Sequence, residues 1–411
     1  MADIEALNAV AAANIEAVNG VAKANIETIN GVGIGGLVAA TYWAVCFDDN
    51  KISWAAAADI ASESVWATNV DDPVASASSS GTDTIDIAYG KDNSGNGIFL
   101  TIGNSSGNNV WVDQNNDITD ASNWDRINLA DTAKRRTIQW GNDVWVAAGE
   151  MGNTRIHRST DGAANFTSVD VSGLDNIVTG TKVTGLASDG AGNWMFGQAA
   201  NLYFSSDDAA TWAFLLQPEG TGNTINDIVF TNNTWVVLYN NGGAQAWVIT
   251  CPAAAAANMD DTGDWGTTQR LTGAVYVNGG GTDEGTTHLH GTLSTRMAAA
   301  GGRVVFLQSG NGHNDMAFTT AADVSGKTCT LKNIVVNVPV SGSGGTNVPY
   351  GIATDGITWL IGAGGEDDGR NGGDICRSTN GGDSWALIVE GIDNDSTNEI
   401  NGIAPNVYLP L

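Results

Sequence analysis

The chain is poor in basic residues. Its 411 residues include 17 Lys and Arg against 45 Asp and Glu, a formal net charge of −28. This charge would repel a polyphosphate backbone and an anionic membrane surface. We therefore expect no nucleic acid and no membrane surface among its partners.

Cysteines and long hydrophobic runs are also scarce. Cys46, Cys251, Cys329 and Cys376 lie far apart without a CxxC pair, which predicts buried thiols in place of a disulfide framework. The chain does not begin with a basic segment followed by an apolar core, so we see no secretory signal. The apolar stretch 32–45 is too short to span a bilayer, so we expect no membrane insertion. A protein that functions outside the cell would then have to be released by another route, such as lysis of a host cell.

Glycine and tryptophan are abundant, while proline is not. The chain has 53 Gly, 14 Trp and 7 Pro. Short aromatic runs between turns rich in Gly, Asn and Asp are typical of an all-β fold.

One strand pattern recurs along the chain: a turn, a bulky apolar residue, and further apolar residues that often end in Gly. Three further short strands accompany most copies, as in a propeller blade of roughly 40 to 50 residues. The C-terminal segment 400–411 resembles the inner strand that the first unit lacks. The sequence therefore predicts a β-propeller of about seven blades over residues 37–411, closed by its C-terminal strand. The copies contain Trp43, Phe99, Trp145, Trp194, Trp235, Val305 and Trp359, at intervals of 41 to 70 residues.

Residues 1–36 form a separate segment with an 11-residue repeat. Apolar residues at positions 1 and 4 of each copy predict an amphipathic α-helix with about 3.67 residues per turn. Such a narrow stripe would need a partner, so we expect either an anchor that docks and oligomerises or a plain helical cap. Asn19-Gly20 and Asn30-Gly31 favour breaks, which leaves several short helices as an alternative. A glycine-rich joint, 31–36, precedes the propeller. The apolar positions of the predicted anchor are Ile4, Leu7, Ile15, Val18, Ile26 and Ile29.

The run VNGVAKANIETINGV within this repeat resembles the INGV-type repeats of tailed-phage structural proteins. The resemblance covers about 30 residues. It implies a virion component, made in the host cytoplasm and released by lysis, that contacts other virion proteins through residues 1–36. A homo-oligomer would suit such an anchor.

Three turns share the pattern Ser-x-Asp/Asn followed by an aromatic residue. They resemble the Asp-box, SxDxGxxW, of sialidase-like and photosystem-assembly propellers, in which the motif is structural. The acid or amide would cap turn amides, and the aromatic side chain would pack between sheets. The residues concerned are Ser159, Asp161, Gly162 and Phe166, then Ser205, Asp207 and Trp212, then Ser378, Asn380, Gly381 and Trp385.

No catalytic constellation stands out. A sialidase needs three arginines to grip a carboxylate, but arginine is sparse and none precedes Arg126. His288 and His290, near Asp283 and Glu284, lack a third ligand, and the acidic loop 365–374 lacks EF-hand spacing for Ca²⁺. We therefore expect no enzyme activity, no cofactor and no metal.

These observations favour a structural component of a phage virion. The propeller would be displayed from a tail fibre, baseplate or head surface for attachment to a glycan or protein of the host. Two alternatives stay open: a cellular adhesin or assembly scaffold, and a propeller-fold enzyme that processes glycans.

Overall fold

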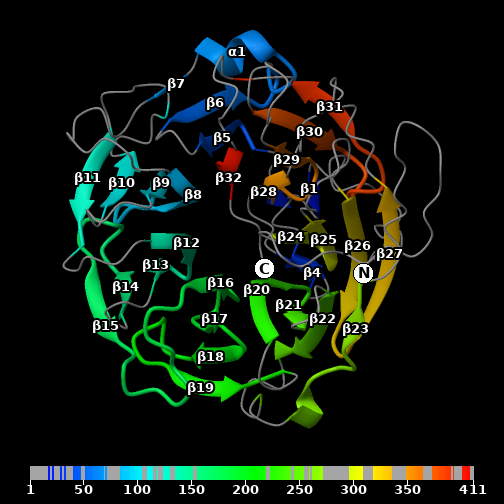
Figure 1. Cartoon of the computed structure of the whole chain (residues 1–411). Helices are drawn as coiled ribbons and strands as arrows, with labels where there is room; N and C mark the ends of the chain where they lie inside the picture. The colour runs from blue at the N-terminus through cyan, green and yellow to red at the C-terminus, as the bar shows by residue number, and fades with distance from the viewer. Residues whose placement is uncertain are drawn as a thin grey trace.

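The computed structural model shows a ring of sheets around a central axis (Figure 1). It describes residues 17–18, 21–22, 28–29, 32–33, 40–47, 51–68, 70–71, 84–103, 109–113, 118, 124–129, 135–150, 155–218, 223–241, 245–253, 259, 262–271, 296–308, 318–335, 349–363, 373–389, 392 and 400–407.

Seven sheets form the blades, and each has four antiparallel strands arranged in order from the central axis outwards. Blade 1 contains β32 (Ile400–Pro405), β5 (Tyr42–Phe47), β6 (Ile52–Ala56) and β7 (Val70–Asp71). Blade 2 contains β8 (Thr84–Lys91), β9 (Gly97–Gly103), β10 (Asn109–Asp113) and β11 (Trp124–Asn128). Blade 3 contains β12 (Arg135–Gly141), β13 (Val144–Gly149), β14 (Arg155–Ser159) and β15 (Thr167–Asp170). Blade 4 contains β16 (Val183–Ser188), β17 (Trp194–Gln198), β18 (Asn201–Ser205) and β19 (Ala213–Leu216).

The remaining three blades complete the ring. Blade 5 contains β20 (Asn223–Thr231), β21 (Thr234–Asn241), β22 (Gln245–Pro252) and β23 (Gln269–Arg270). Blade 6 contains β24 (Met297–Ala300), β25 (Arg303–Gln308), β26 (Phe318–Ser325) and β27 (Thr328–Val335). Blade 7 contains β28 (Pro349–Thr354), β29 (Trp359–Ala363), β30 (Asp374–Ser378) and β31 (Ala386–Val389). The predicted seven-bladed propeller is confirmed.

The C-terminal strand closes the ring, as the sequence predicted. Strand β32 pairs with β5, with Ile403 opposite Val45 and Pro405 opposite Trp43. Asn406 then ties the two chain ends together: its side-chain oxygen accepts the backbone N–H groups of Thr41 and Tyr42, each at 2.8 Å. Strand β5 therefore has partners on both sides, β32 and β6, and is not left as an edge that could pair with another chain.

The hydrophobic core lies between neighbouring blades. The second strand of each blade carries a large side chain that is almost completely buried, such as Trp145, Trp194 or Trp235. Trp145 of blade 3 packs with Leu100 and Ile102 of blade 2, and Trp235 of blade 5 packs with Met195 of blade 4. Because each contact joins two blades, the aromatic side chains stabilise the ring as a whole.

The predicted N-terminal helix is not confirmed. The residues described there form two short hairpins, β1 (Ala17–Val18) with β2 (Val21–Ala22) and β3 (Thr28–Ile29) with β4 (Val32–Gly33). Val18 and Ile29, predicted on a helix, thus lie in strands, and an Asn-Gly pair separates the two strands of each hairpin. Asn-Gly is the strongest two-residue hairpin signal, and it outweighs the helical spacing at these positions. The other predicted anchor positions, Ile4, Leu7, Ile15 and Ile26, lie outside the described residues.

Helical structure is minor in the described part of the chain. It comprises α1 (Glu63–Thr68) in blade 1 and the 3-10 helix η6 (Thr262–Asp264) in blade 5. Among the residues described, no helix has the length and apolar character needed to cross a membrane.

Candidate functional site

The innermost strands place one residue of each blade at the same height around the central axis. The pairing register identifies this residue in each blade. In blade 5, Asp227 lies opposite Leu238 of the second strand, and Leu238 comes three residues after the buried Trp235. In blade 6 the equivalent of this tryptophan is Val304, one residue before the Val305 that the sequence repeat indicated. From blade 1 to blade 7, the residues at this height are Gly402, Asp86, Thr137, Gly185, Asp227, Arg296 and Gly351. The only charged residues among them are Asp86, Asp227 and Arg296.

The two aspartates are held in the same way. Each follows a β-bulge of its inner strand, a feature that re-aims the next side chain. Asp86 accepts the backbone N–H of Ile87 at 3.1 Å and, across the blade boundary, that of Ile138 at 3.1 Å. Each carboxylate therefore joins its own strand to the inner strand of the next blade.

Asp227 repeats this arrangement between blades 5 and 6. Its two oxygens accept the backbone N–H groups of Ile228 at 2.8 Å and Met297 at 2.6 Å. Both aspartates are buried, with exposed fractions of 9% for Asp86 and 8% for Asp227. The N–H groups would otherwise be unpaired donors in the interior, which is costly.

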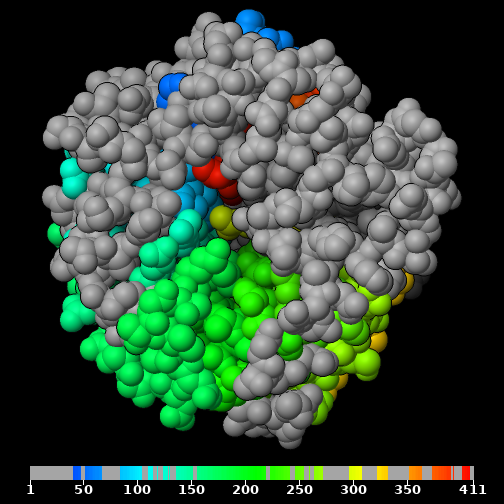
Figure 2. Space-filling model, in the orientation of Figure 1, coloured from blue at the N-terminus to red at the C-terminus, as the bar shows by residue number. Residues whose placement is uncertain are grey.

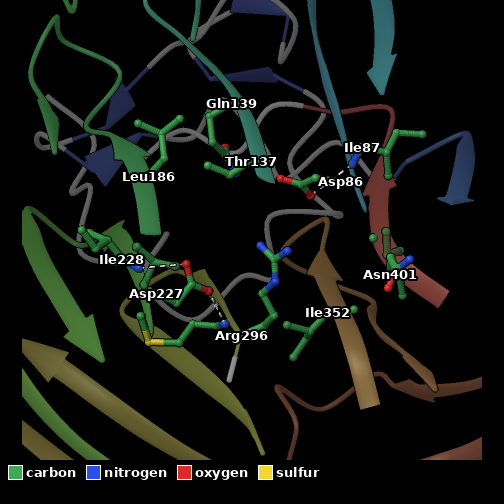
Figure 3. A pocket seen from close by; sticks show the side chains of 15 residues that line it. Asp86, Ile87, Thr137, Gln139, Leu186, Asp227, Ile228, Arg296, Ile352 and Asn401 are labelled. Atoms are coloured by element: carbon green, nitrogen blue, oxygen red, sulfur yellow. Dashed lines mark hydrogen bonds between the residues drawn. The ribbon is translucent and has the colours of Figure 1, made fainter. Parts of the chain in front are cut away.

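Arg296 points its guanidinium group into a central cavity between the two carboxylates (Figure 3). The cavity has a volume of about 90 Å³, and Thr137, Gln139 and Asn401 also line it. The guanidinium group of Arg296 makes no salt bridge within 4 Å with either carboxylate, although both interact with its charge. The cavity therefore combines a half-buried cation with two carboxylates that backbone amides already hold.

Burial controls the ionisation of these carboxyl groups. It raises the pKa of Asp227 to about 7, against the lowering effects of Arg296 and of the hydrogen bonds from Met297 and Ile228, while the charge of Asp86 raises it further. Burial likewise raises the pKa of Asp86, and the charge of Arg296 and the backbone N–H of Ile138 oppose the rise. The carboxyl group of Asp227 thus titrates near neutral pH, inside a cavity that also contains the guanidinium group of Arg296.

The turns predicted to resemble the Asp-box lie away from this cavity and share one hydrogen-bond network. Ser159 Oγ donates to Asp161 Oδ1 at 2.8 Å and accepts the backbone N–H of Ala163 at 3.0 Å. Asp161 Oδ1 also accepts the backbone N–H of Asn165 at 2.9 Å. Equivalent bonds connect Ser205, Asp207, Ala209 and Thr211 in blade 4, and Ser378, Asn380, Gly382 and Ser384 in blade 7.

Asn380 departs from the motif but forms the same turn. Its Oδ1 accepts the hydroxyl of Ser378 at 2.8 Å and the backbone N–H of Ser384 at 3.0 Å, and its amide nitrogen donates to Ser384 Oγ at 2.8 Å. An amide oxygen and a carboxylate oxygen are therefore equivalent in this turn.

The aromatic residue of each turn packs towards the preceding blade. Phe166 contacts the core between blades 2 and 3, Trp212 that between blades 3 and 4, and Trp385 that between blades 6 and 7. Arg303 of blade 6 also donates to Gly381 O at 2.9 Å and pairs with Asp383, so it holds the turn of blade 7 from across the boundary. These turns connect blades and present no reactive group to the cavity.

The described residues contain no group of three or more side chains suited to hold a metal ion. The predicted candidates His288, His290, Asp283 and Glu284 lie outside those residues, as does most of the acidic loop 365–374.

The four cysteines are free and buried, as predicted. Burial raises the pKa of Cys251, Cys329 and Cys376 to about 12, and it raises that of Cys46 as well. Their thiols are therefore protonated and unreactive near neutral pH.

Sequence reasoning missed the residues of the central cavity. A signal was present for two of them: Asp86 and Asp227 each precede an isoleucine within an inner strand, in IDIAYG and NDIVFTN. An aspartate at the same register of two otherwise apolar strands would have indicated a special position. Arg296 precedes a plain Met-Ala-Ala-Ala strand, and nothing local marks it.

Comparison with known proteins supports the fold and goes no further. No family model matches the chain, and no curated protein matches it. A solved structure titled "Crystal structure of RRP9 WD40 repeats" is 8% identical, with a TM-score of 0.54 over 82% of this chain and 90% of that one. "Structure of U3-55K" is 8% identical, with a TM-score of 0.52 over 82% and 91% of the two chains. "YCF48 bound to D1 peptide" is 12% identical, with a TM-score of 0.45 over 74% and 80%. The likeness of the first two structures shows that the chain has a β-propeller fold, and at such identities it shows the fold alone.

Proposed function

We propose that this chain is a non-enzymatic structural protein of a phage virion that displays its propeller for attachment to the host surface. The observation that carries the binding role is the use of Asp86 and Asp227. Each accepts two backbone N–H groups and joins two blades, so both carboxyl groups hold the ring together. A rigid closed ring with this interior is suited to present surfaces and loops.

The way the chain joins the ring supports display from an anchor. Ala40 donates its backbone N–H to Asp355 Oδ2 at 3.0 Å, on the hairpin between the first two strands of blade 7. Asn406, which follows the last strand of the propeller in the sequence, forms hydrogen bonds with Thr41 and Tyr42. Both ends are thus fixed at the face that carries the hairpins between first and second strands. A partner that holds residues 1–36 would pull on this hydrogen-bonded junction and not on a loose edge.

The virion assignment rests on the INGV-type repeat, whose copies precede this junction. Other virion proteins would be the partners of that segment, and a host glycan or protein would be the partner of the propeller. The net charge of −28 supports a partner other than nucleic acid.

Immunoelectron microscopy of purified particles tests this proposal. An antibody against the propeller should label a fixed place on the tail or head of each particle. A matched antibody against a lysis protein would control for debris. Particles without label, together with antigen found only on cells, would reject the virion assignment in favour of an adhesin.

A further inference from the structure

We infer that the central cavity binds a neutral hydroxylated ligand, the vicinal hydroxyl groups of a sugar, between Arg296 and Asp227. The inference rests on the proposed function only for the source of the sugar, a host glycan. The cavity itself is lined by described residues at the inner strands of all seven blades.

The central cavity contains hydrogen-bond donors and acceptors that the protein leaves unused. A guanidinium group carries five N–H donors, and that of Arg296 lies inside the cavity without a salt bridge to Asp86 or Asp227 (Figure 3). An ionised carboxylate offers about four acceptor sites. Two of those of Asp227 are occupied by the N–H groups of Ile228 and Met297. Donors and acceptors with spare capacity therefore line the same small space.

The donors and acceptors of the cavity match the hydroxyl groups of a ligand. A hydroxyl both donates and accepts, so one can accept from Arg296 while its neighbour donates to Asp227. Gln139 and Thr137, which line the cavity, add an amide and a hydroxyl that also serve either role. A carboxylate ligand would accept from Arg296 but would be repelled by Asp86 and Asp227 whenever these groups are ionised. An ammonium ligand would meet the charge of Arg296.

The size of the cavity and its access from solvent limit the ligand. A cavity of about 90 Å³ accommodates roughly three water molecules, taking about 30 Å³ for each. It therefore admits the diol edge of a terminal sugar and not a whole oligosaccharide. In Figure 2, atoms in the colours of β24 and β32 are visible in a hollow at the middle of the face shown, so inner strands are reached from that side.

Titration of the full-length protein with neutral methyl glycosides of glucose, galactose and mannose tests the inference, with acetate as the charged probe. Saturation-transfer NMR and calorimetry would measure binding. At least one glycoside should bind saturably, and Arg296→Gln should weaken that binding by about ten-fold or more, because a charged donor is lost. Arg155→Gln, which removes the same charge from an exposed position on β14, should leave binding unchanged.

A second variant covers the case in which Arg296→Gln does not fold. Gln139→Leu replaces a lining amide by an apolar group of similar size and should also weaken glycoside binding. The inference is overturned if no glycoside binds, if binding is indifferent to both variants, or if only acetate binds in an Arg296-dependent way. Attachment of labelled protein to host cells separates the two proposals. Attachment that survives Arg296→Gln keeps the proposed function and rejects this site as its basis.

Discussion

Aspartates accept backbone N–H groups in two regions of this propeller, and the surroundings give them opposite properties. In the exposed turns, burial acts to raise the pKa of Asp161, but the hydrogen bonds from the Asn165 side chain and backbone outweigh it, so the pKa is lowered. In the central cavity, burial prevails over similar bonds, and the pKa of Asp227 rises to about 7. The same interaction is therefore a local cap at the surface and a titratable link between blades in the interior.

The strongest test of this comparison removes a buried link. We expect Asp86→Ala to lower the free energy of unfolding by about 4 kcal/mol, because it leaves the N–H groups of Ile87 and Ile138 without acceptors in the interior. Denaturant unfolding at pH 7 measures the change. Asp189→Ala, which removes a partly exposed hairpin acceptor in blade 4, is the matched control and should cost no more than about 1 kcal/mol. Equal losses in the two variants would contradict the distinction between interior and surface.

The raised pKa of Asp227 predicts a pH dependence of stability. Between the unfolded value of 3.8 and the folded value of about 7, the folded state binds the extra proton. This contribution to stability is therefore present at acidic pH and is lost as the pH rises through about 7. The free energy of unfolding of Asp227→Asn, measured relative to that of the wild type, should therefore increase by about 3 kcal/mol from pH 5 to pH 8.

Paired denaturant titrations of the two proteins at several pH values would measure that difference. Taking the difference cancels the opposing effect of Asp161 and Asp207, whose lowered pKa values contribute stability that is lost in acid. A difference that does not change with pH would show that Asp227 keeps an ordinary pKa.

A smaller effect is expected where a surface turn touches the neighbouring blade. Gly162 has φ of 67°, and a Cβ there would lie 1.9 Å from the backbone nitrogen of Asn93 in blade 2. Gly162→Ala should therefore destabilise the protein by about 2 kcal/mol or more, through both the left-handed backbone and the clash. Gly95→Ala isolates the backbone term, because Gly95 has φ of 82° with no atom within 4 Å of its Cβ position. The melting temperature of Gly95→Ala should fall by much less than that of Gly162→Ala.

The smallest expected effect is the loss of one surface cap. Asp161→Ala should cost about 1 kcal/mol, as other side-chain caps of exposed backbone N–H groups do. Asp161→Asn should retain most of the stability, since Asn380 forms the same turn in blade 7. Thermal melts of both variants give the comparison. An asparagine variant as unstable as the alanine variant would show that the negative charge, and not the acceptor oxygen, stabilises the turn.

The number of blades, the closure by the C-terminal strand and the buried cysteines could be predicted from the sequence. Each depends on a pattern that repeats or on residue types that behave alike wherever they occur. The N-terminal segment carries two local signals that conflict. The 1, 4 spacing of apolar residues predicted a helix, while an Asn-Gly pair stands in the sequence between the paired strands β1 and β2, and another between β3 and β4.

The sequence by itself determined the strands, the turns and the aromatic side chains that fill the space between blades, because these follow from short-range spacing and turn chemistry. Only the tertiary structure decided which charges share the central cavity. Asp86 and Asp227 come from the inner strands of blades 2 and 5, and Arg296 directly precedes the inner strand of blade 6, so they are far apart in the sequence. They meet because closure of the ring brings equivalent register positions of all seven inner strands around one axis, and the burial that closure imposes then sets the ionisation of their side chains.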